Sequence, residues 1–170
     1  MDTDVSLLQG TELFKDLSPE QIRKVLHICR PVRFSENDVI MKEGELGHSM
    51  YVIMEGTVEV IKRLILAEVE DEEITEKSKV FTRLDASSHA VFGEMALLEQ
   101  LRRTATVRAV TACTLYKIDK DDFLDLAEAD FEFGYRILKN LAGIVSARLR
   151  KADEDTIKLT TVLSMLLNEA

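Results

Sequence analysis

The chain has 170 residues, 46% of them hydrophobic and 31% charged, a balance typical of one globular domain with a sizeable core. It excludes a disordered tail, and the few Gly and Pro residues exclude a low-complexity or collagen-like chain. No apolar run approaches the roughly 18 residues that a membrane span needs. Asp2 and Asp4 stand where an export signal would be basic, so we expect a cytoplasmic protein that does not associate with membranes.

The charge balance is acidic, with 22 basic and 31 acidic residues and a net charge of −9. Such a chain repels the phosphate backbone of nucleic acids, which disfavours direct DNA binding. An acidic stretch over 68–76 indicates a solvated loop or strand edge, since it lacks the residue pattern of a calcium-binding loop. We expect Cys29 and Cys113 to be buried thiols rather than a disulfide.

The first predicted element is a short helix that begins after Ser18. Ser18 can cap it, Pro19 suits its first turn, and Gln21 completes a capping box. Pro31 marks its end. From Val32 to Ile118 the apolar residues alternate in short runs that glycines interrupt, which predicts roughly eight strands in a sandwich or small barrel. The least regular part, 64–80, is expected to be an extended hairpin.

After Ile118 the period becomes helical again, with one helix from Asp119 or Lys120 and a longer one from about Phe131. The longer helix carries apolar residues at alternating spacings of four and three, a heptad pattern with one polar member. This seam either packs on the strand domain of its own chain or pairs with a second copy in a coiled coil. A helix over 131–166 would reach about 50 Å, so its far end needs a partner or breaks, with Asp153 to Asp155 as the expected break. The seam residues are Leu138, Ala142, Val145, Leu149, Ala152, Thr156, Leu159, Leu163 and Leu166.

Between two strand regions lies the stretch 92–98, where a barrel would normally have a tight turn. Met95 to Leu98 favour a turn or two of helix, whose first amides and positive dipole end suit an anion. Gly93 allows close approach of the backbone to a ligand, and Arg103 can form paired hydrogen bonds to a phosphate. Glu94 would repel a phosphate, so we expect it to accept a hydrogen bond from a ribose hydroxyl. These residues together predict a site for a sugar phosphate with a free hydroxyl.

The sequence resembles the cyclic nucleotide-binding domain family over about 13–150, the family of bacterial catabolite activator proteins, kinase regulatory subunits and cyclic-nucleotide-gated channels. The matching motifs are the turn Gly44-Glu45-x-Gly47, the strand Tyr51-Val52-Ile53 with Gly56, the cassette Phe92-Gly93-Glu94 and the segment Arg103-Thr104-Ala105. The resemblance implies a mainly β fold with flanking helices: a double-stranded β-helix, or jelly-roll-like barrel, with a short N-terminal helix and a long C-terminal lid helix. The corresponding parts are 1–130 for the barrel domain and 131–170 for the lid or dimerisation helix.

The resemblance also implies the roles of single residues in binding cAMP or cGMP. Glu94 would bind the ribose 2′-hydroxyl and Arg103 the cyclic phosphate. The amides of the cassette would complete the phosphate site, with the Thr104 hydroxyl as a further donor. The residues expected at the ligand are Phe92, Gly93, Glu94, Met95, Ala96, Arg103, Thr104 and Ala105.

The alternative for Arg103 is a surface ion pair with Glu94 or Glu99, and Arg102 is expected to face solvent. His89 stands where the family usually has Gly, either as a tolerated loop residue or as one that reshapes the cassette entrance. No spacing predicts a metal site or a catalytic set, so we expect neither a cofactor nor enzymatic activity.

In the family, polar residues a few positions beyond an Arg-Leu step on the long helix read the base. Here that step is Arg148-Leu149, and Asp153 and Glu154 follow it. Their carboxylates could accept from guanine N–H groups, which favours cGMP, whereas bacterial members of this shape more often respond to cAMP, which we place first. The expected function is a cytoplasmic sensor whose C-terminal helix closes on the ligand. The alternatives are the sensor half of a Crp/Fnr-type transcription regulator without its DNA-binding domain, and a dimerising module that no longer binds nucleotide.

Overall fold

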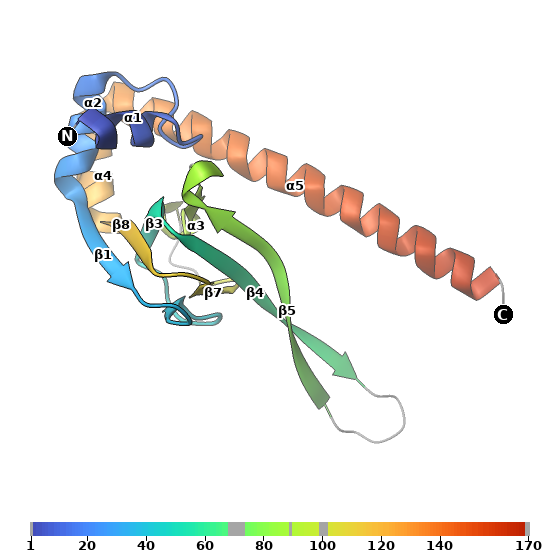
Figure 1. Cartoon of the computed structure of the whole chain (residues 1–170). Coiled ribbons are helices and arrows are strands. Elements are labelled where there is room, and N and C mark those ends of the chain that lie inside the picture. Colours follow the sequence, from blue (N-terminus) through green and yellow to red (C-terminus); the bar gives the residue numbers. More distant parts are fainter. Residues whose placement is uncertain (1, 68–73, 89, 99–101, 169–170) are drawn as a thin grey trace.

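Two antiparallel sheets of four strands each form the barrel (Figure 1). The computed structural model describes residues 2–67, 74–88, 90–98 and 102–168. One sheet has the strand order β1-β8-β3-β6 and the other β2-β7-β4-β5. The strands are β1 (Cys29–Phe34), β2 (Val39–Met41), β3 (Ser49–Glu55), β4 (Thr57–Ala67), β5 (Ile74–Asp85), β6 (Val91–Phe92), β7 (Thr106–Ala109) and β8 (Cys113–Asp119), with a 3-10 turn η1 (Ala86–Ser88) after β5. The predicted mainly β fold with about eight strands is confirmed.

The alternation of β3 explains how the two sheets share a core. Tyr51 and Ile53 lie inside the barrel, whereas Met50 and Val52 point to the opposite face and contact the helices. Both faces of this strand are therefore buried, as expected for side chains that alternate with a period of two. β4 and β5 pair along their whole length as the expected extended hairpin, which projects beyond the barrel in Figure 1.

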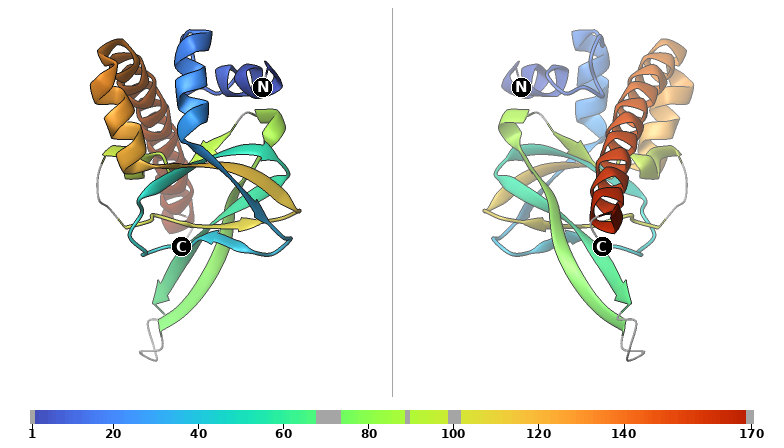
Figure 2. Two further views of the ribbon diagram at one scale, coloured as in Figure 1. Left: turned by 90° about the vertical axis from the view of Figure 1, so that its left-hand side faces the viewer. Right: turned by 90° about the vertical axis from the view of Figure 1, so that its right-hand side faces the viewer.

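The helices gather on one side of the barrel (Figure 2). They are α1 (Asp2–Gln9), α2 (Pro19–Ile28), α3 (Met95–Leu98), α4 (Lys120–Ala129) and α5 (Phe131–Asn168). The capping box of Ser18 and Gln21 is confirmed, but α2 ends at Ile28 and Pro31 lies within β1. The helix α1 before it was not predicted. None of the described helices is long and apolar enough to cross a membrane.

The long helix α5 is continuous over 38 residues, so the expected break near Asp153 is wrong. Its first turns pack against α4 and in the core between the helices and the barrel, through a stripe spaced by four, four and three residues that is not the heptad seam. Beyond these turns the helix leaves the barrel and projects away from it (Figure 1). The stripe consists of Phe133, Ile137, Leu141 and Ile144, all buried.

Candidate functional site

The cassette begins where β6 ends, inside the barrel. Phe92 is buried and stacks on Tyr51, with 5.1 Å between the ring centroids. This contact fixes the point at which the chain leaves the sheet. The predicted helical turn follows as α3, whose amides at Ala96 and Leu97 donate to the carbonyls of Gly93 and Glu94.

Arg103 is held by the turn that contains Gly44 and Gly47, although 56 or more residues separate them in the sequence. Its backbone N–H donates to the Glu45 carbonyl at 2.7 Å, and its own carbonyl accepts from the Gly44 N–H at 2.9 Å. Arg102 is exposed, as expected, and its guanidinium donates to the Gly44 carbonyl. The two family motifs therefore form one local structure that positions the Arg103 side chain.

The Arg103 guanidinium lies between two glycines. A Cβ atom at Gly47 would come within 2.6 Å of its Nε, and one at Gly93 within 2.7 Å of its Nη1. Gly93 also has φ +75°, a left-handed conformation that side chains rarely adopt. Any larger residue at either position would displace the guanidinium, so both glycines are needed for its placement.

The hydrogen bonds of this guanidinium go to uncharged oxygens. Nη2 donates to the Ser49 carbonyl at 2.7 Å and to the Ser49 hydroxyl at 3.4 Å, and Nη1 donates to the Gly93 carbonyl at 3.3 Å. Burial lowers the pKa of Arg103, against the opposing effect of nearby Tyr51, Glu94 and Glu45, and it stays protonated. The expected alternative, an ion pair with Glu94, is not formed; Glu99 lies outside the described residues. Arg103 is therefore a half-buried cation bound by dipoles rather than by an anion.

Glu94 is 1% exposed, and its partner comes from the long helix. Nη1 of Arg148 donates to Oε1 of Glu94 across 54 residues of sequence. A buried carboxylate requires such a partner, because an isolated charge is strongly unfavourable away from water. The pair ties the cassette to α5. The pairing of Arg148 with Glu94 is not predicted from the sequence. The only sequence signal near it is the Arg148-Leu149 step, which marks the position of the base-reading residues in the family.

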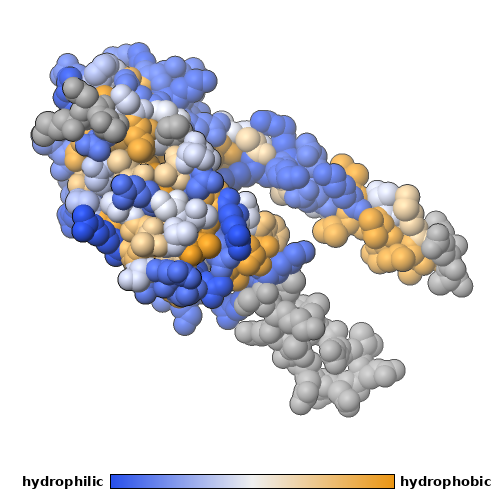
Figure 3. Space-filling model, in the orientation of Figure 1, coloured by the Kyte–Doolittle hydropathy of each residue, from blue (hydrophilic) through white to orange (hydrophobic). Residues whose placement is uncertain are grey.

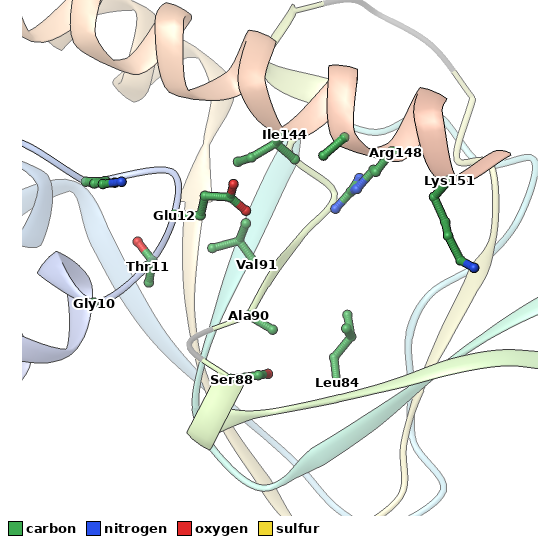
Figure 4. A pocket seen from close by; sticks show the side chains of 12 residues that line it. Gly10, Thr11, Glu12, Leu84, Ser88, Ala90, Val91, Ile144, Arg148 and Lys151 are labelled. Carbon is green, nitrogen blue, oxygen red and sulfur yellow. The ribbon is translucent and has the colours of Figure 1, made fainter. Parts of the chain in front are cut away.

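A groove of about 600 Å³ lies beside this pair, between α5 and the barrel (Figure 4). Arg148 and Lys151 line it from α5, and Val91 and Leu84 line it from the barrel. The loop after α1 closes its end through Thr11 and Glu12. The groove does not include Arg103, so it adjoins the cassette at Arg148 rather than containing the predicted phosphate contacts.

The other predicted residues divide into two sets. Thr104 is exposed and Ala105 buried, both beside Arg103, and Met95 is exposed at the start of α3. Asp153 and Glu154 are exposed and do not line the groove. Helix spacing places Asp153 about 140° around α5 from Arg148, so it points away from the pocket of its own chain. The expectation for His89 falls on a residue outside the described ones. Among the described residues, no group of three or more His, Cys, Asp or Glu could hold a metal ion.

Comparisons with known proteins identify relatives over more than half of the chain. A family model described as the cyclic nucleotide-binding domain matches residues 31–130. A Drosophila melanogaster cGMP-dependent protein kinase (isozyme 2 forms cD4/T1/T3A/T3B) is 31% identical over 112 residues, which are 66% of this chain and 9% of the kinase. The chain thus spans about a tenth of the length of such curated relatives.

Solved structures show the same fold. The Thermus thermophilus catabolite activator protein aligns with a TM-score of 0.72 and 25% identity, over 88% of this chain and 63% of that one. A cAMP-bound PfPKA-R chain aligns with a TM-score of 0.60 and 30% identity, over 74% of this chain and 40% of that one. Since the family model covers more than half of the sequence, the chain belongs to the cyclic nucleotide-binding domain family.

Proposed function

We propose that this chain is a sensor domain that binds cAMP, or cGMP as the second candidate, with the cyclic phosphate at Arg103. The observation that carries the proposal is the placement of this guanidinium. It is half-buried between Gly47 and Gly93, and its hydrogen bonds go to Ser49 and to the Gly93 carbonyl. A phosphate would add the compensating negative charge, and a guanidinium can meet two phosphate oxygens at once.

The ribose would lie toward Glu94. A cyclic nucleotide keeps a free 2′-hydroxyl, which can donate to a carboxylate oxygen. Arg148 contacts Oε1 of Glu94, so the second oxygen is the acceptor that we assign to the hydroxyl. The Thr104 hydroxyl and the amides of Gly93, Met95 and Ala105 would complete the phosphate site, whereas the Ala96 amide already donates to the Gly93 carbonyl. The groove along α5 offers space for the base.

We assign the lid role to α5 because it contributes the partner of Glu94. A ligand that binds Glu94 changes the surroundings of the Arg148 guanidinium, and through it the preferred position of the helix. The ligand would shift α5 only by its difference in affinity between the open and closed positions. This coupling needs no further element, since the Glu94–Arg148 pair already joins the cassette and the helix.

We also propose that two copies pair through α5. The heptad seam is exposed, with Leu138 at 58%, Leu149 at 62% and Leu159 at 72%. The buried stripe of the same helix lies in the core shared by the helices and the barrel, so the seam is a second apolar face. Figure 3 shows hydrophobic residues gathered on the far part of the helix. A sustained heptad repeat of this kind is typical of a coiled coil.

The proposal is tested by titration calorimetry with cAMP, cGMP and 2′-deoxy-cAMP. We expect micromolar or tighter binding of cAMP and weaker binding of the deoxy compound. Glu94→Gln should weaken the binding of cAMP, and in this variant the difference between cAMP and 2′-deoxy-cAMP should nearly disappear. Glu36→Gln is the matched control, since Glu36 is exposed in the turn between β1 and β2 and does not line the groove, and it should bind cAMP as the parent does. Absence of binding by both natural nucleotides would refute the proposed function.

A further inference from the structure

Charged residues flank the exposed seam at positions that would face each other if two copies paired through it. In the heptad that fits the spacing, Leu149 and Ala152 are successive core positions. Arg148 directly precedes the first of them and Asp153 directly follows the second. In a parallel, in-register coiled coil, the residue before the first core position of a heptad faces the residue that follows the second core position of the partner helix, five places further along. Arg148 would therefore face Asp153 of the second copy.

The two side chains are free to meet in this arrangement. The Arg148 side chain is 53% exposed although one of its nitrogens binds the buried Glu94. A guanidinium carries five N–H donors, so the remaining ones can serve a second carboxylate. Asp153 is exposed on the side of α5 that points away from its own pocket, and within the described part of the chain it forms no ion pair.

In an antiparallel pair in which Leu149 packs against Ala152 of the second copy, Arg148 would lie opposite Asp155 of that copy instead. Asp155 already lies 3.0 Å from Lys151 and 3.8 Å from Lys158 on its own helix. Arg148 would then compete with two lysines for one carboxylate, whereas Asp153 has no such competitor. The charges therefore favour the parallel arrangement.

We propose that Arg148 is shared between two carboxylates, Glu94 in its own pocket and Asp153 of a second copy. The inference rests on the dimer through α5 proposed above. It makes Asp153 a positioning residue, because its pair with the partner holds the guanidinium that covers the pocket carboxylate. Dimer formation and the nucleotide site are then linked, and each must change the affinity of the other by the same factor.

The first test compares Asp153→Asn with Asp155→Asn by analytical ultracentrifugation of the whole chain. Each dimer contains two Arg148–Asp153 pairs, so Asp153→Asn should raise the dimer dissociation constant about fivefold, and less at 1 M salt. Asp155→Asn should leave it within about twofold. In an Arg148→Gln background, the effect of Asp153→Asn should disappear. A monomeric chain at 100 μM, an unchanged constant in Asp153→Asn, or a larger effect of Asp155→Asn would each overturn the inference.

The second test measures cAMP affinity at protein concentrations below and above the dimer dissociation constant. The parent chain should show two different affinities. In Asp153→Asn the difference between the two cAMP affinities should be smaller, even at concentrations where the variant is dimeric. Equal affinities of the parent monomer and dimer would refute the linkage. The dimer measurement does not depend on ligand. If cAMP does not bind but Asp153→Asn still weakens the dimer, the proposed nucleotide binding is refuted and the Arg148–Asp153 pair is supported. If a strictly monomeric chain binds cAMP, nucleotide binding is supported and the Arg148–Asp153 pair is refuted.

Discussion

Replacing Arg103 by alanine removes the only cation that the structure places between Gly47 and Gly93 in the described part of the chain. In the parent chain, this guanidinium donates to the Ser49 carbonyl at 2.7 Å and more weakly to the Gly93 carbonyl at 3.3 Å. On ligand binding it would gain two hydrogen bonds to a charged phosphate. The truncation should therefore act mainly on affinity for the nucleotide.

The magnitude follows from these contacts. A hydrogen bond to a charged group contributes about 2 kcal/mol, so two phosphate bonds give about 4 kcal/mol. To bind the phosphate, Arg103 gives up its long hydrogen bond to the Gly93 carbonyl, which reduces this gain by about 1 kcal/mol. The net loss of about 3 kcal/mol corresponds to an affinity reduced roughly a hundredfold. Arg103→Lys keeps the charge but loses the planar pair of donors, so it should fall between the parent and Arg103→Ala.

The assay is titration calorimetry with cAMP and cGMP, accompanied by circular dichroism to confirm the fold. Arg102→Ala is the matched control, because the neighbouring Arg102 is exposed and binds only the Gly44 carbonyl through its guanidinium. It should change affinity by less than about threefold. A folded Arg103→Ala variant that binds both nucleotides as tightly as the parent would show that the phosphate does not lie at this side chain.

Three further predictions concern the site and the stability of the domain. Gly47→Ala should weaken cAMP binding about tenfold in the same calorimetric assay, because its Cβ would lie 2.6 Å from the Arg103 Nε and displace that side chain. An affinity equal to that of the parent would contradict the placement of Arg103 beside Gly47. Gly143→Ala should raise the melting temperature by about 2–4 °C, since a Cβ there meets nothing within 4 Å and alanine is the better helix former; a lower melting temperature would contradict the open surroundings. Burial raises the pKa of the Cys29 thiol from 9.0 to about 12. The buried neutral thiol therefore contributes fully to the free energy of unfolding below pH 9, and this contribution is lost as the pH rises from 9 to 12. Over this range the urea midpoint should fall more in the parent than in Cys29→Ala, and an equal fall in both would contradict the burial of the thiol.

Features that depend on neighbouring residues could be predicted from the sequence. The capping box joins Ser18 and Gln21 within one helical turn, so both partners are visible together. The alternation that defines β3 is likewise local, and it shows which side chains share a face. The short helix after Gly93 follows from the helix preference of Met95 to Leu98. Such patterns establish the mainly β fold and the position of the cassette.

Contacts between distant segments could not be predicted in the same way. Ser49 binds Arg103 mainly through its backbone carbonyl, which any residue would provide, so no side-chain pattern points to it. The Arg148 partner of Glu94 depends on where α5 crosses the barrel, and that crossing is set by packing rather than by local sequence. The helix α1 has only eight residues, and its stability comes from contacts such as the burial of Leu8 in the common core.

The long helix shows why its two possible roles could not be separated by pattern alone. The buried stripe through Ile137, Leu141 and Ile144 lies one residue before the seam through Leu138, Ala142 and Val145, so the two stripes run side by side. After Ile144 the buried stripe reaches Arg148, where its apolar character ends, while the seam continues to Leu166. The buried face of α5 thus ends with an ion pair to Glu94, and beyond this point only the exposed seam continues. A change at the pocket carboxylate therefore reaches the helix at the junction between its two faces, and for this reason we assign both the lid and the dimer contact to α5.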